Sequence, residues 1–390
     1  MEAFDEKTCL CALNRIFGFE PRIGQALIEN IGSAADIFGL TGKEIDGLTG
    51  PFSTKYKGKI SKRAYDEAAE ELHRLSGKGI RFIGCNEKSY PSALKECEDY
   101  PLGLYFRGSS PPEEVFINRK DIAVVGTRDI SPYGREWCRR IVDTLAASDI
   151  RPTIVSGLAI GTDICAHTAA LENDLPTIAV MATGPDKIYP CRHMDFAERL
   201  VCTPGSALVT DYPSGTAPLA PHFLRRNRII AGLSDATILV ESRIKGGGMT
   251  TARLAFSYNR DVFALPGRVD DIRSQGCNYL IKNKIAEPIT SSEALMESLG
   301  LPTGKTKRER DSREVIEETY GRRMSSDRIR EMAVVLMAIR HERGINIDEL
   351  AAISGLGYSR TADIVGILET DGLITVDLLR RCHINFFRSK

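Results

Sequence analysis

The sequence lacks several features that would assign the chain to a broad class. Its 52 Lys and Arg residues are balanced by 52 Asp and Glu residues, so no net charge is available to coat a nucleic acid over the whole surface. No apolar run approaches the roughly 20 residues that a membrane helix needs, and the first residues show no leader pattern. We therefore expect a cytoplasmic protein without membrane contact, in which any basic groove is local.

Metal and hydrolase motifs are also missing. The 10 cysteines are scattered and form no CxxC pair, so we expect no metal site and interpret most of them as small core residues of a reduced protein. There is no GxxxxGK[ST], HExxH or GxSxG segment. These absences favour a binding protein without a cofactor over an enzyme.

Three regions differ in their hydrophobic pattern. Residues 1–75 have apolar side chains at helical spacing, which predicts a small helical domain. Residues 78–298 alternate amphipathic stretches with short apolar runs, and this pattern predicts an α/β domain with a doubly wound parallel sheet. Residues 300–328 are polar and indicate a linker. Residues 329–390 show three helix patterns followed by two short strands at 373–376 and 383–387, which is the order of a winged helix. The strands predicted in the middle region lie at 122–125, 153–155, 177–180, 207–209, 237–240 and 261–265.

Loops after these strands carry residues suited to phosphate, and in an open parallel sheet ligands bind beyond the carboxyl ends of the strands. After 122–125, Arg128 offers a planar guanidinium for phosphate oxygens. In the next loop, Ser156, Gly157 and Gly161 are small and leave backbone N–H groups free at the start of a helix, which is an anion site. We interpret His167, on that helix, as a structural hydrogen-bonding residue.

Two further segments add basic residues and glycines. A helix that opens near Pro221 places an aromatic ring beside polar side chains, namely Phe223, Arg225, Arg226, Asn227 and Arg228. Phosphate contacts next to a stacking ring suit single-stranded nucleic acid, although a solvated basic face with the ring in the core is an open alternative. The loop after 237–240 contains Lys245, Gly246, Gly247 and Gly248. Glycine allows close backbone approach to a phosphate, and we expect Thr250 or Thr251 to cap the following helix.

In combination, these segments resemble the DprA/Smf family of DNA-processing proteins. The resemblance rests on AVVGTR at 123–128, SGLAIGTDICAH at 156–167, RNRIIAGLS at 226–234 and FALPG at 263–267. It implies an extended Rossmann-like domain, flanked by a helical domain of the SAM or helix-hairpin-helix-like type and by a C-terminal winged helix. It also implies binding of single-stranded DNA in natural transformation, loading of RecA recombinase onto DNA covered by single-strand-binding protein, and a homodimer formed through the Rossmann-like domain. The loop and helix residues named above would line the DNA pocket.

Two alternatives belong to other functional classes. Phosphoribohydrolases of the lysine-decarboxylase-like type have a similar glycine loop, PGGxGTxxE, in which the Glu is catalytic. Here Leu254 and Ala255 follow the loop and no Glu stands in register, which argues against hydrolysis. A regulator of duplex DNA acting through the winged helix is the other alternative. Its recognition helix would begin with Arg360 as the single basic residue, so a protein contact explains the segment equally well.

Overall fold

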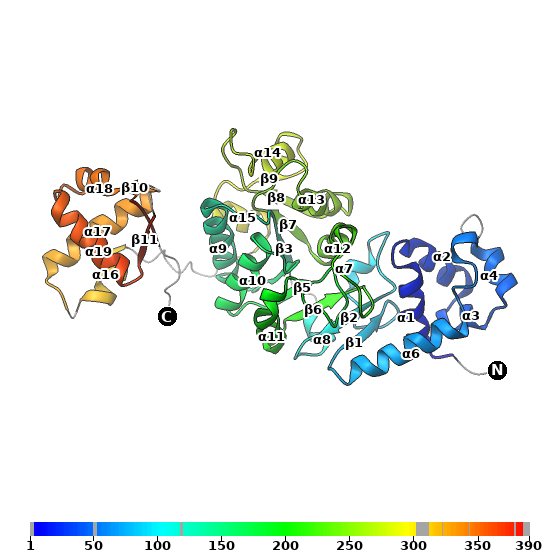
Figure 1. Ribbon diagram of the computed structural model, residues 1–390. Coiled ribbons are helices and arrows are strands. Elements are labelled where there is room, and N and C mark those ends of the chain that lie inside the picture. The colour runs from blue at the N-terminus through cyan, green and yellow to red at the C-terminus, as the bar shows by residue number, and fades with distance from the viewer. Residues whose placement is uncertain are drawn as a thin grey trace. The chain divides into compact units, whose positions relative to one another are not determined.

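A computed structural model describes residues 4–49, 53–117, 120–301, 312–321, 323–342, 344–377 and 380–384. The chain forms two units, Met1–Gly304 and Lys305–Lys390 (Figure 1). None of the described helices is long and apolar enough to cross a bilayer.

A nine-stranded sheet lies at the centre of the first unit, with the strand order β1-β2-β6-β5-β4-β3-β7-β8-β9. The seven strands β6-β5-β4-β3-β7-β8-β9 pair with one another in parallel. At the other edge, β1 pairs with β2, and β2 with β6, in antiparallel register. The bounds are β1 Arg81–Gly84, β2 Gly103–Arg107, β3 Asp121–Val125, β4 Thr153–Ser156, β5 Thr177–Val180, β6 Ala207–Thr210, β7 Ala236–Leu239, β8 Asp261–Ala264 and β9 Glu287–Pro288.

The six predicted strands correspond to β3 through β8, so the predicted α/β class with a largely parallel sheet is confirmed. At one edge β1 and β2, which were not predicted, extend this sheet with antiparallel pairs. An antiparallel pair needs no helical crossover, and these two strands pair directly, with Phe82 opposite Tyr105 and their rings 5.1 Å apart.

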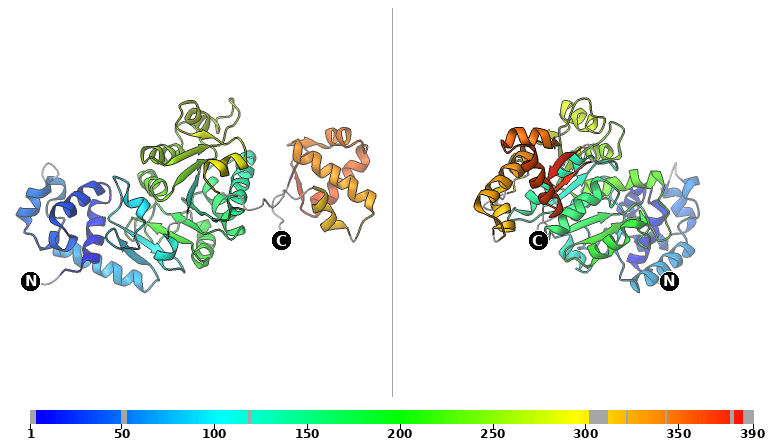
Figure 2. Two further views of the ribbon diagram at one scale, coloured as in Figure 1. Left: turned by 180° about the vertical axis from the view of Figure 1, so that it is seen from behind. Right: turned by 60° about the vertical axis from the view of Figure 1, so that its left-hand side comes forward.

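The central strands are apolar throughout because both faces of the sheet are covered. Ile122 and Val124 of β3 belong to the core beneath α9, α10 and α15, whereas Ala123 and Val125 belong to the core beneath α12 and α13 (Figures 1 and 2). This alternation follows from the period of two in a strand. The helices of this part are α7 Ser92–Lys95, α8 Pro112–Val115, α9 Pro132–Ala146, α10 Thr162–Glu172, α11 Met194–Cys202, α12 Ala220–Leu233, α13 Gly247–Ser257, α14 Gln275–Lys282 and α15 Ser292–Ser298.

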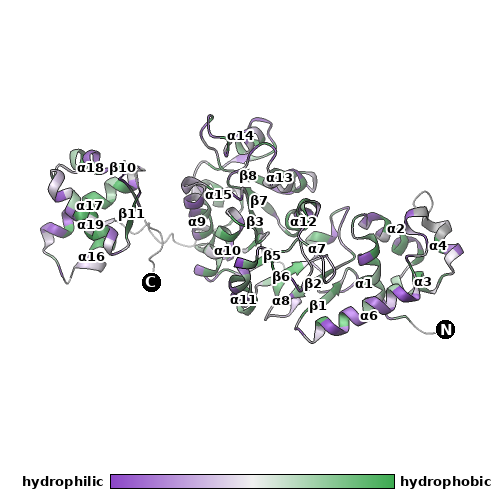
Figure 3. Cartoon of the chain, viewed as in Figure 1, coloured by the Kyte–Doolittle hydropathy of each residue, from purple (hydrophilic) through white to green (hydrophobic). Residues whose placement is uncertain are grey.

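The N-terminal helices share a core with the sheet. Leu10, Leu13 and Phe17 of α1 are buried in the cluster that also contains Ala123 and Val125 of β3. The apolar residues are concentrated on the inner elements, while α6 shows many polar residues along its length (Figure 3). The helices are α1 Glu6–Phe17, α2 Pro21–Ile31, α3 Ala34–Gly39, α4 Gly42–Thr49, α5 Ser53–Tyr56 and α6 Lys62–Ser76.

The second unit contains four described helices and a small antiparallel sheet of order β10-β12-β11. The predicted linker includes α16, whose Ile316 and Tyr320 are buried in the core of this unit, so polar composition alone misplaces its start. Residues 302–311 of that linker and residues 385–387 of the last predicted strand lie outside the described residues. The elements are α16 Ser312–Tyr320, α17 Ser326–His341, α18 Ile347–Ser354, α19 Tyr358–Thr370, β10 Ile345–Asn346, β11 Ile374–Val376 and β12 Arg381–Ile384.

Candidate functional site

The strand order of the sheet reverses at β3. The chain continues from β3 through β4, β5 and β6 on one side, while β7 and β8 lie on the other. Such a reversal opens a crevice beyond the carboxyl ends of the diverging strands, where ligands bind in open α/β sheets. The loops after β3, β4 and β7 therefore meet at the position where a ligand is expected.

Glycines allow these loops to touch. A Cβ atom on Gly248 would lie 3.2 Å from the Cα of Gly126, and one on Gly161 would lie 2.3 Å from the carbonyl oxygen of Thr127. Gly161 also has a φ of 85°, a conformation that favours glycine. The backbone N–H of Thr162 donates to the Thr127 carbonyl at 3.1 Å and joins the first two loops.

The N-terminus of α13 is open. Its N-cap is Gly246, and the first turn has neither a capping side chain among the described residues nor an acidic residue. The expectation that Thr250 or Thr251 caps this helix is wrong, because the helix begins at Gly247 and both threonines lie inside it. A Cβ atom on Gly247 would meet no atom of the described chain within 4 Å. Free N–H groups and the helix dipole make this end an anion site.

The N-termini of the two neighbouring helices, α9 and α10, each have a carboxylate close by. Ser131 caps α9, and its backbone N–H donates to the buried carboxylate of Glu241 at 2.9 Å. Asp163 lies in the first turn of α10, and one of its carboxylate oxygens accepts from the N–H of Ala159 at 3.3 Å. A carboxylate near an N-terminus satisfies the same positive end that a phosphate would use. Among the described residues, α13 is thus the helix of these three whose N-terminus has neither a side-chain cap nor a carboxylate in its first turn.

An exposed cation and two aromatic rings form a patch beside this terminus, which we call the Arg128 patch: Arg128, Phe223 and Tyr189. The guanidinium carbon of Arg128 lies 4.9 Å from the centroid of the Phe223 ring, which lies 5.6 Å from that of Tyr189. Arg128 is exposed and has no ion-pair partner in the described part of the chain. Phe223 is half-buried rather than in the core, and Tyr189 is 42% exposed. Tyr189 was not among the predicted site residues, because it comes from a separate loop.

Two arginines of α12 are engaged inside the protein. Arg225 and Arg228 both donate to the same carboxylate oxygen of Asp211, Arg228 at 2.6 Å. The side chains of Arg225 and Arg228 are 12% and 6% exposed, and that of Asp211 is fully buried. The alternative of a solvated basic face is therefore wrong.

Arg226 and Asn227 hold the loops of the crevice in place. Arg226 is buried beneath Gly157, where a Cβ atom would lie 2.0 Å from its Nη1, and it donates to the carbonyl of Val180. Burial lowers the pKa of Arg226 to about 10, while the nearby Asp163 carboxylate opposes this effect. The Nδ2 of Asn227 donates to the carbonyl of Gly247 at 3.3 Å, which ties α12 to the start of α13.

The remaining predicted residues divide between the interior and the surface. The hydroxyl of Ser156 is buried and donates to the carbonyl of Val124 at 2.7 Å. A Cβ atom on Gly246 would lie 2.2 Å from the Ser242 hydroxyl, so a larger residue there would require this hydroxyl to move. Lys245 is exposed in the same loop, and so is Arg243, which sequence reasoning did not single out.

His167 has the structural role that the sequence suggested. Its ring is fully buried, and Nδ1 lies 2.7 Å from the hydroxyl of Thr177. Burial lowers the pKa of His167 to about 3, so the ring is neutral at pH 7.

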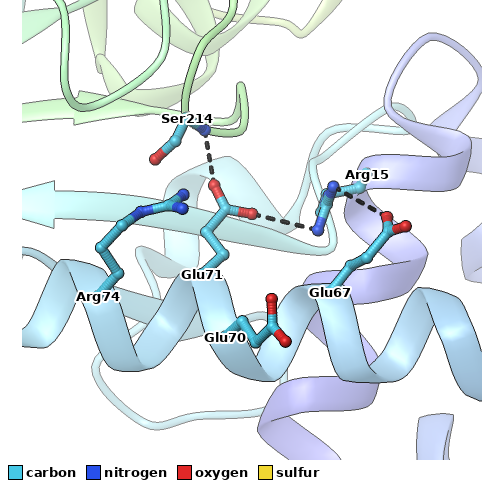
Figure 4. Close-up of a pocket in the computed structure, with 6 residues that line it drawn as sticks. All are labelled: Arg15, Glu67, Glu70, Glu71, Arg74 and Ser214. Atoms are coloured by element: carbon cyan, nitrogen blue, oxygen red, sulfur yellow. Dashed lines mark hydrogen bonds and ion pairs between the residues drawn. The ribbon is translucent and has the colours of Figure 1, made fainter.

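A cavity of about 200 Å³ lies where the N-terminal helices meet the loop after β6. There Glu71 accepts the Ser214 N–H at 2.6 Å and lies 3.5 Å from Arg15, as Figure 4 shows. Because its buried acid accepts a backbone N–H of this loop and is ion-paired with Arg15 of α1, the cavity is a junction that attaches α6 to this loop.

The sequence model for DNA recombination-mediator protein A matches residues 81–300, which span all nine strands of the large sheet and the crevice. The chain belongs to this family.

Relatives in the DNA recombination-mediator protein A family include the Smf protein of Escherichia coli K12, 41% identical over 217 residues, which are 56% of this chain and 56% of that protein. The DNA processing protein DprA of Streptococcus pneumoniae R6 is 37% identical over 209 residues, 53% of this chain and 70% of that protein. The chain thus spans little more than half of the E. coli relative's length.

Solved DprA structures share the fold. The X-ray structure of DprA from S. pneumoniae matches with a TM-score of 0.61 at 28% identity and covers 73% of this chain and 95% of that one. A structure of DprA from Helicobacter pylori, described for its single-stranded DNA binding mode, matches with a TM-score of 0.50 at 29% identity, over 56% of this chain and 95% of that one.

Proposed function

We propose that this protein is a non-enzymatic recombination mediator that binds single-stranded DNA in the crevice at the carboxyl ends of β3, β4 and β7. The observation that carries the proposal is the Arg128 patch beside the open N-terminus of α13. Single-stranded nucleic acid is bound by cations that hold phosphates and by aromatic faces on which bases stack. Membership of the DNA recombination-mediator family supports this function.

Each part of the crevice has a distinct role in this proposal. Arg128, Lys245 and the N–H groups of Gly247 and Gly248 contact phosphates, and Phe223 stacks a base, with Tyr189 added to the predicted set. The other predicted residues act from behind this surface and fix its shape, namely Ser156, Gly157, Gly161, Arg225, Arg226, Asn227, Arg228 and Gly246. Phosphate and stacking contacts carry little sequence information, so binding is expected to depend weakly on sequence.

Hydrolysis on the same fold lacks its catalytic group. A phosphoribohydrolase needs a carboxylate that follows the glycine loop, and α13 contains no Asp or Glu. The nearest buried acid at the end of β7, Glu241, accepts hydrogen bonds from Ser131 at the start of α9. This carboxylate is committed to capping, so the arrangement supports binding without turnover.

The proposal includes partners that the family resemblance implies. They are RecA recombinase, DNA covered by single-strand-binding protein, and a second copy of the chain joined through the Rossmann-like domain. Exposed apolar side chains on and near α13 and α14 support a protein contact on that side: Phe256, Val269, Ile272 and Tyr279. A cytoplasmic location is part of the same proposal.

We further propose that residues 1–75 form a SAM or helix-hairpin-helix-like domain and that residues 329–390 form a winged helix. In the second unit, Arg360 at the start of α19 lies 2.7 Å from Glu331, and Arg328 pairs with Asp363. The positive charge at the start of the recognition helix is thus compensated. This favours a protein contact over duplex DNA for the winged helix.

The test is a fluorescence-anisotropy titration of a labelled poly-dT oligonucleotide over a salt series, with an equal-length duplex as competitor. Arg128→Ala should weaken binding about tenfold or more, because a charge-assisted hydrogen bond contributes about 1.5–3 kcal/mol. It should also reduce the salt slope by about 0.7, the value for one phosphate contact on a single strand. Arg63→Ala, which removes an exposed cation on α6, is the matched control. Wild-type affinity of Arg128→Ala at matched salt would refute the role of Arg128.

A further inference from the structure

We infer that Phe19, in the turn between α1 and α2, is a second base-stacking position for the same single strand, reached across the first turn of α12. This inference rests on the proposed function and extends it to the N-terminal helices. Phe19 is 60% exposed, yet its ring is held by neighbours on its protein side. It therefore presents a fixed aromatic surface to solvent.

A layered group of side chains holds this ring. The guanidinium carbon of Arg225 lies 4.9 Å from the centroid of Phe19 and 4.8 Å from that of Tyr212, so the cation contacts both rings. Arg225 is itself fixed by its ion pair with Asp211. An aromatic ring fixed on its protein side loses little conformational freedom when a base stacks on its exposed side.

His222 links the Phe19 group to the Arg128 patch. Its ring lies 5.7 Å from that of Phe19 and 4.7 Å from that of Tyr212, and its Nδ1 is 2.8 Å from the carbonyl oxygen of Ala217. The next residue, Phe223, belongs to the Arg128 patch. Two aromatic groups thus lie on adjacent faces of the first turn of α12, because consecutive helical residues are about 100° apart.

The spacing fits a single strand that crosses α12. A helix with its side chains is about 10–12 Å across, so ring groups on adjacent faces of one turn lie within reach of about three stacked nucleotides at a rise of about 3.4 Å. Leu219 is the N-cap of α12 and Leu224 lies on the helix, and they are 54% and 53% exposed. The DNA strand would pass over them. Apolar surface at this point suits bases and sugars rather than a charged partner.

The N-terminal helices are attached to the same loop that carries Asp211. The Nδ2 of Asn14 on α1 donates to the Asp211 carbonyl at 2.9 Å, and Glu71 on α6 accepts the Ser214 N–H (Figure 4). Phe19 therefore keeps its position relative to α12. The acidic neighbour of Phe19, Glu20, is bonded to Lys55 and Tyr56, so its charge is compensated.

Affinities measured with oligonucleotides of different lengths distinguish the Phe19 subsite from the Arg128 patch. We would measure anisotropy with poly-dT of about 4, 8 and 16 nucleotides, the range of site sizes for such grooves. Phe19→Ala should weaken binding of the longer oligonucleotides about 5- to 150-fold, the loss that follows removal of one stacking contact. It should leave the shortest one, which fills the Arg128 patch, unchanged, whereas Arg128→Ala should weaken all lengths.

A tryptophan reporter tests the contact directly. The chain has a single tryptophan, Trp137, so Phe19→Trp in a Trp137→Phe background places one reporter at the site. Its fluorescence should be quenched by the longer oligonucleotides and not by the shortest. Ile150→Trp in the same background, at a residue that is 44% exposed and precedes β4, is the matched control and should not respond.

The outcomes distinguish the two proposals. Phe19→Ala with wild-type affinity at every length, or an unresponsive Phe19→Trp reporter, would overturn the subsite, and if Arg128→Ala still weakened binding the central site would stand. Absence of binding by the wild-type protein would remove the proposed function and this inference together. Thermal unfolding of Phe19→Ala at the wild-type temperature would confirm that lost affinity does not reflect lost folding.

Discussion

Replacing Asp211 by Asn should destabilise the first unit strongly, because one fully buried carboxylate compensates two arginines. Arg225 and Arg228 both donate to its Oδ2, and their side chains are only 12% and 6% exposed. Removing one partner of a buried ion pair costs about 3–5 kcal/mol, since an uncompensated charge stays in the interior. Arg228 retains the carbonyl of Asp99 and Arg225 retains its aromatic contacts, so we expect the lower end, about 3 kcal/mol.

Thermal unfolding followed by tryptophan fluorescence measures this cost. The single tryptophan, Trp137, lies on α9 and reports the first unit alone. A loss of about 3 kcal/mol should lower Tm by about 5 °C for a unit that ends at Gly304, at an unfolding entropy of about 2.1 cal/mol/K per residue. Glu198→Gln is the control, because its ion pair with Arg107 is partly exposed and should contribute less than about 1 kcal/mol. If Asp211→Asn and Glu198→Gln unfold at the same temperature, Asp211 does not compensate the buried arginines as described.

Two further predictions concern stability. Well above pH 6.5 His167 is neutral in both the folded and the unfolded state. As the pH falls, the unfolded chain is protonated at His167 first, because the folded-state pKa is only about 3. Urea unfolding should therefore show a loss of about 2 kcal/mol from this residue between pH 7 and pH 5, and His167→Asn should lack that part of the pH dependence. Gly157→Ala would place a Cβ atom 2.0 Å from Arg226 and should cost about 1–3 kcal/mol. Gly247→Ala, in open space, should be neutral or stabilising by up to about 1 kcal/mol, and equal effects of the two changes would contradict the packing described.

The parallel part of the sheet was predictable because its strands are buried on both faces. A strand such as β3 is almost entirely apolar, and a short apolar run between amphipathic stretches is typical of a strand covered by helices on both sides. The strands β1 and β2 were not predicted. Arg81 interrupts the apolar pattern of β1, and neither strand lies within the strand–helix rhythm that predicts parallel pairing.

The loops of the site were also predictable, but the state of each side chain was not. Glycines after a strand and before a helix indicate a close backbone approach, and Gly126, Gly161 and Gly248 do bring the loops together. Whether an arginine faces solvent depends on residues distant in sequence. Tyr189, which completes the Arg128 patch, comes from another loop. Local pattern carries no information on such tertiary contacts.

The arginines of α12 show why counting charges in the sequence overstates a basic surface. Three arginines within four positions predict a strong local positive charge, yet Arg225 and Arg228 are compensated by Asp211, and Arg226 lies buried near Asp163. The uncompensated cation of the Arg128 patch comes from the loop after β3 instead. In the proposed binding mode, a chain with no net charge binds an anionic strand through a few exposed cations and one open helix terminus, which buried ion pairs hold in position. In this proposal the buried arginines of α12 determine where the surface of the crevice lies, and Arg128 and α13 determine what it attracts.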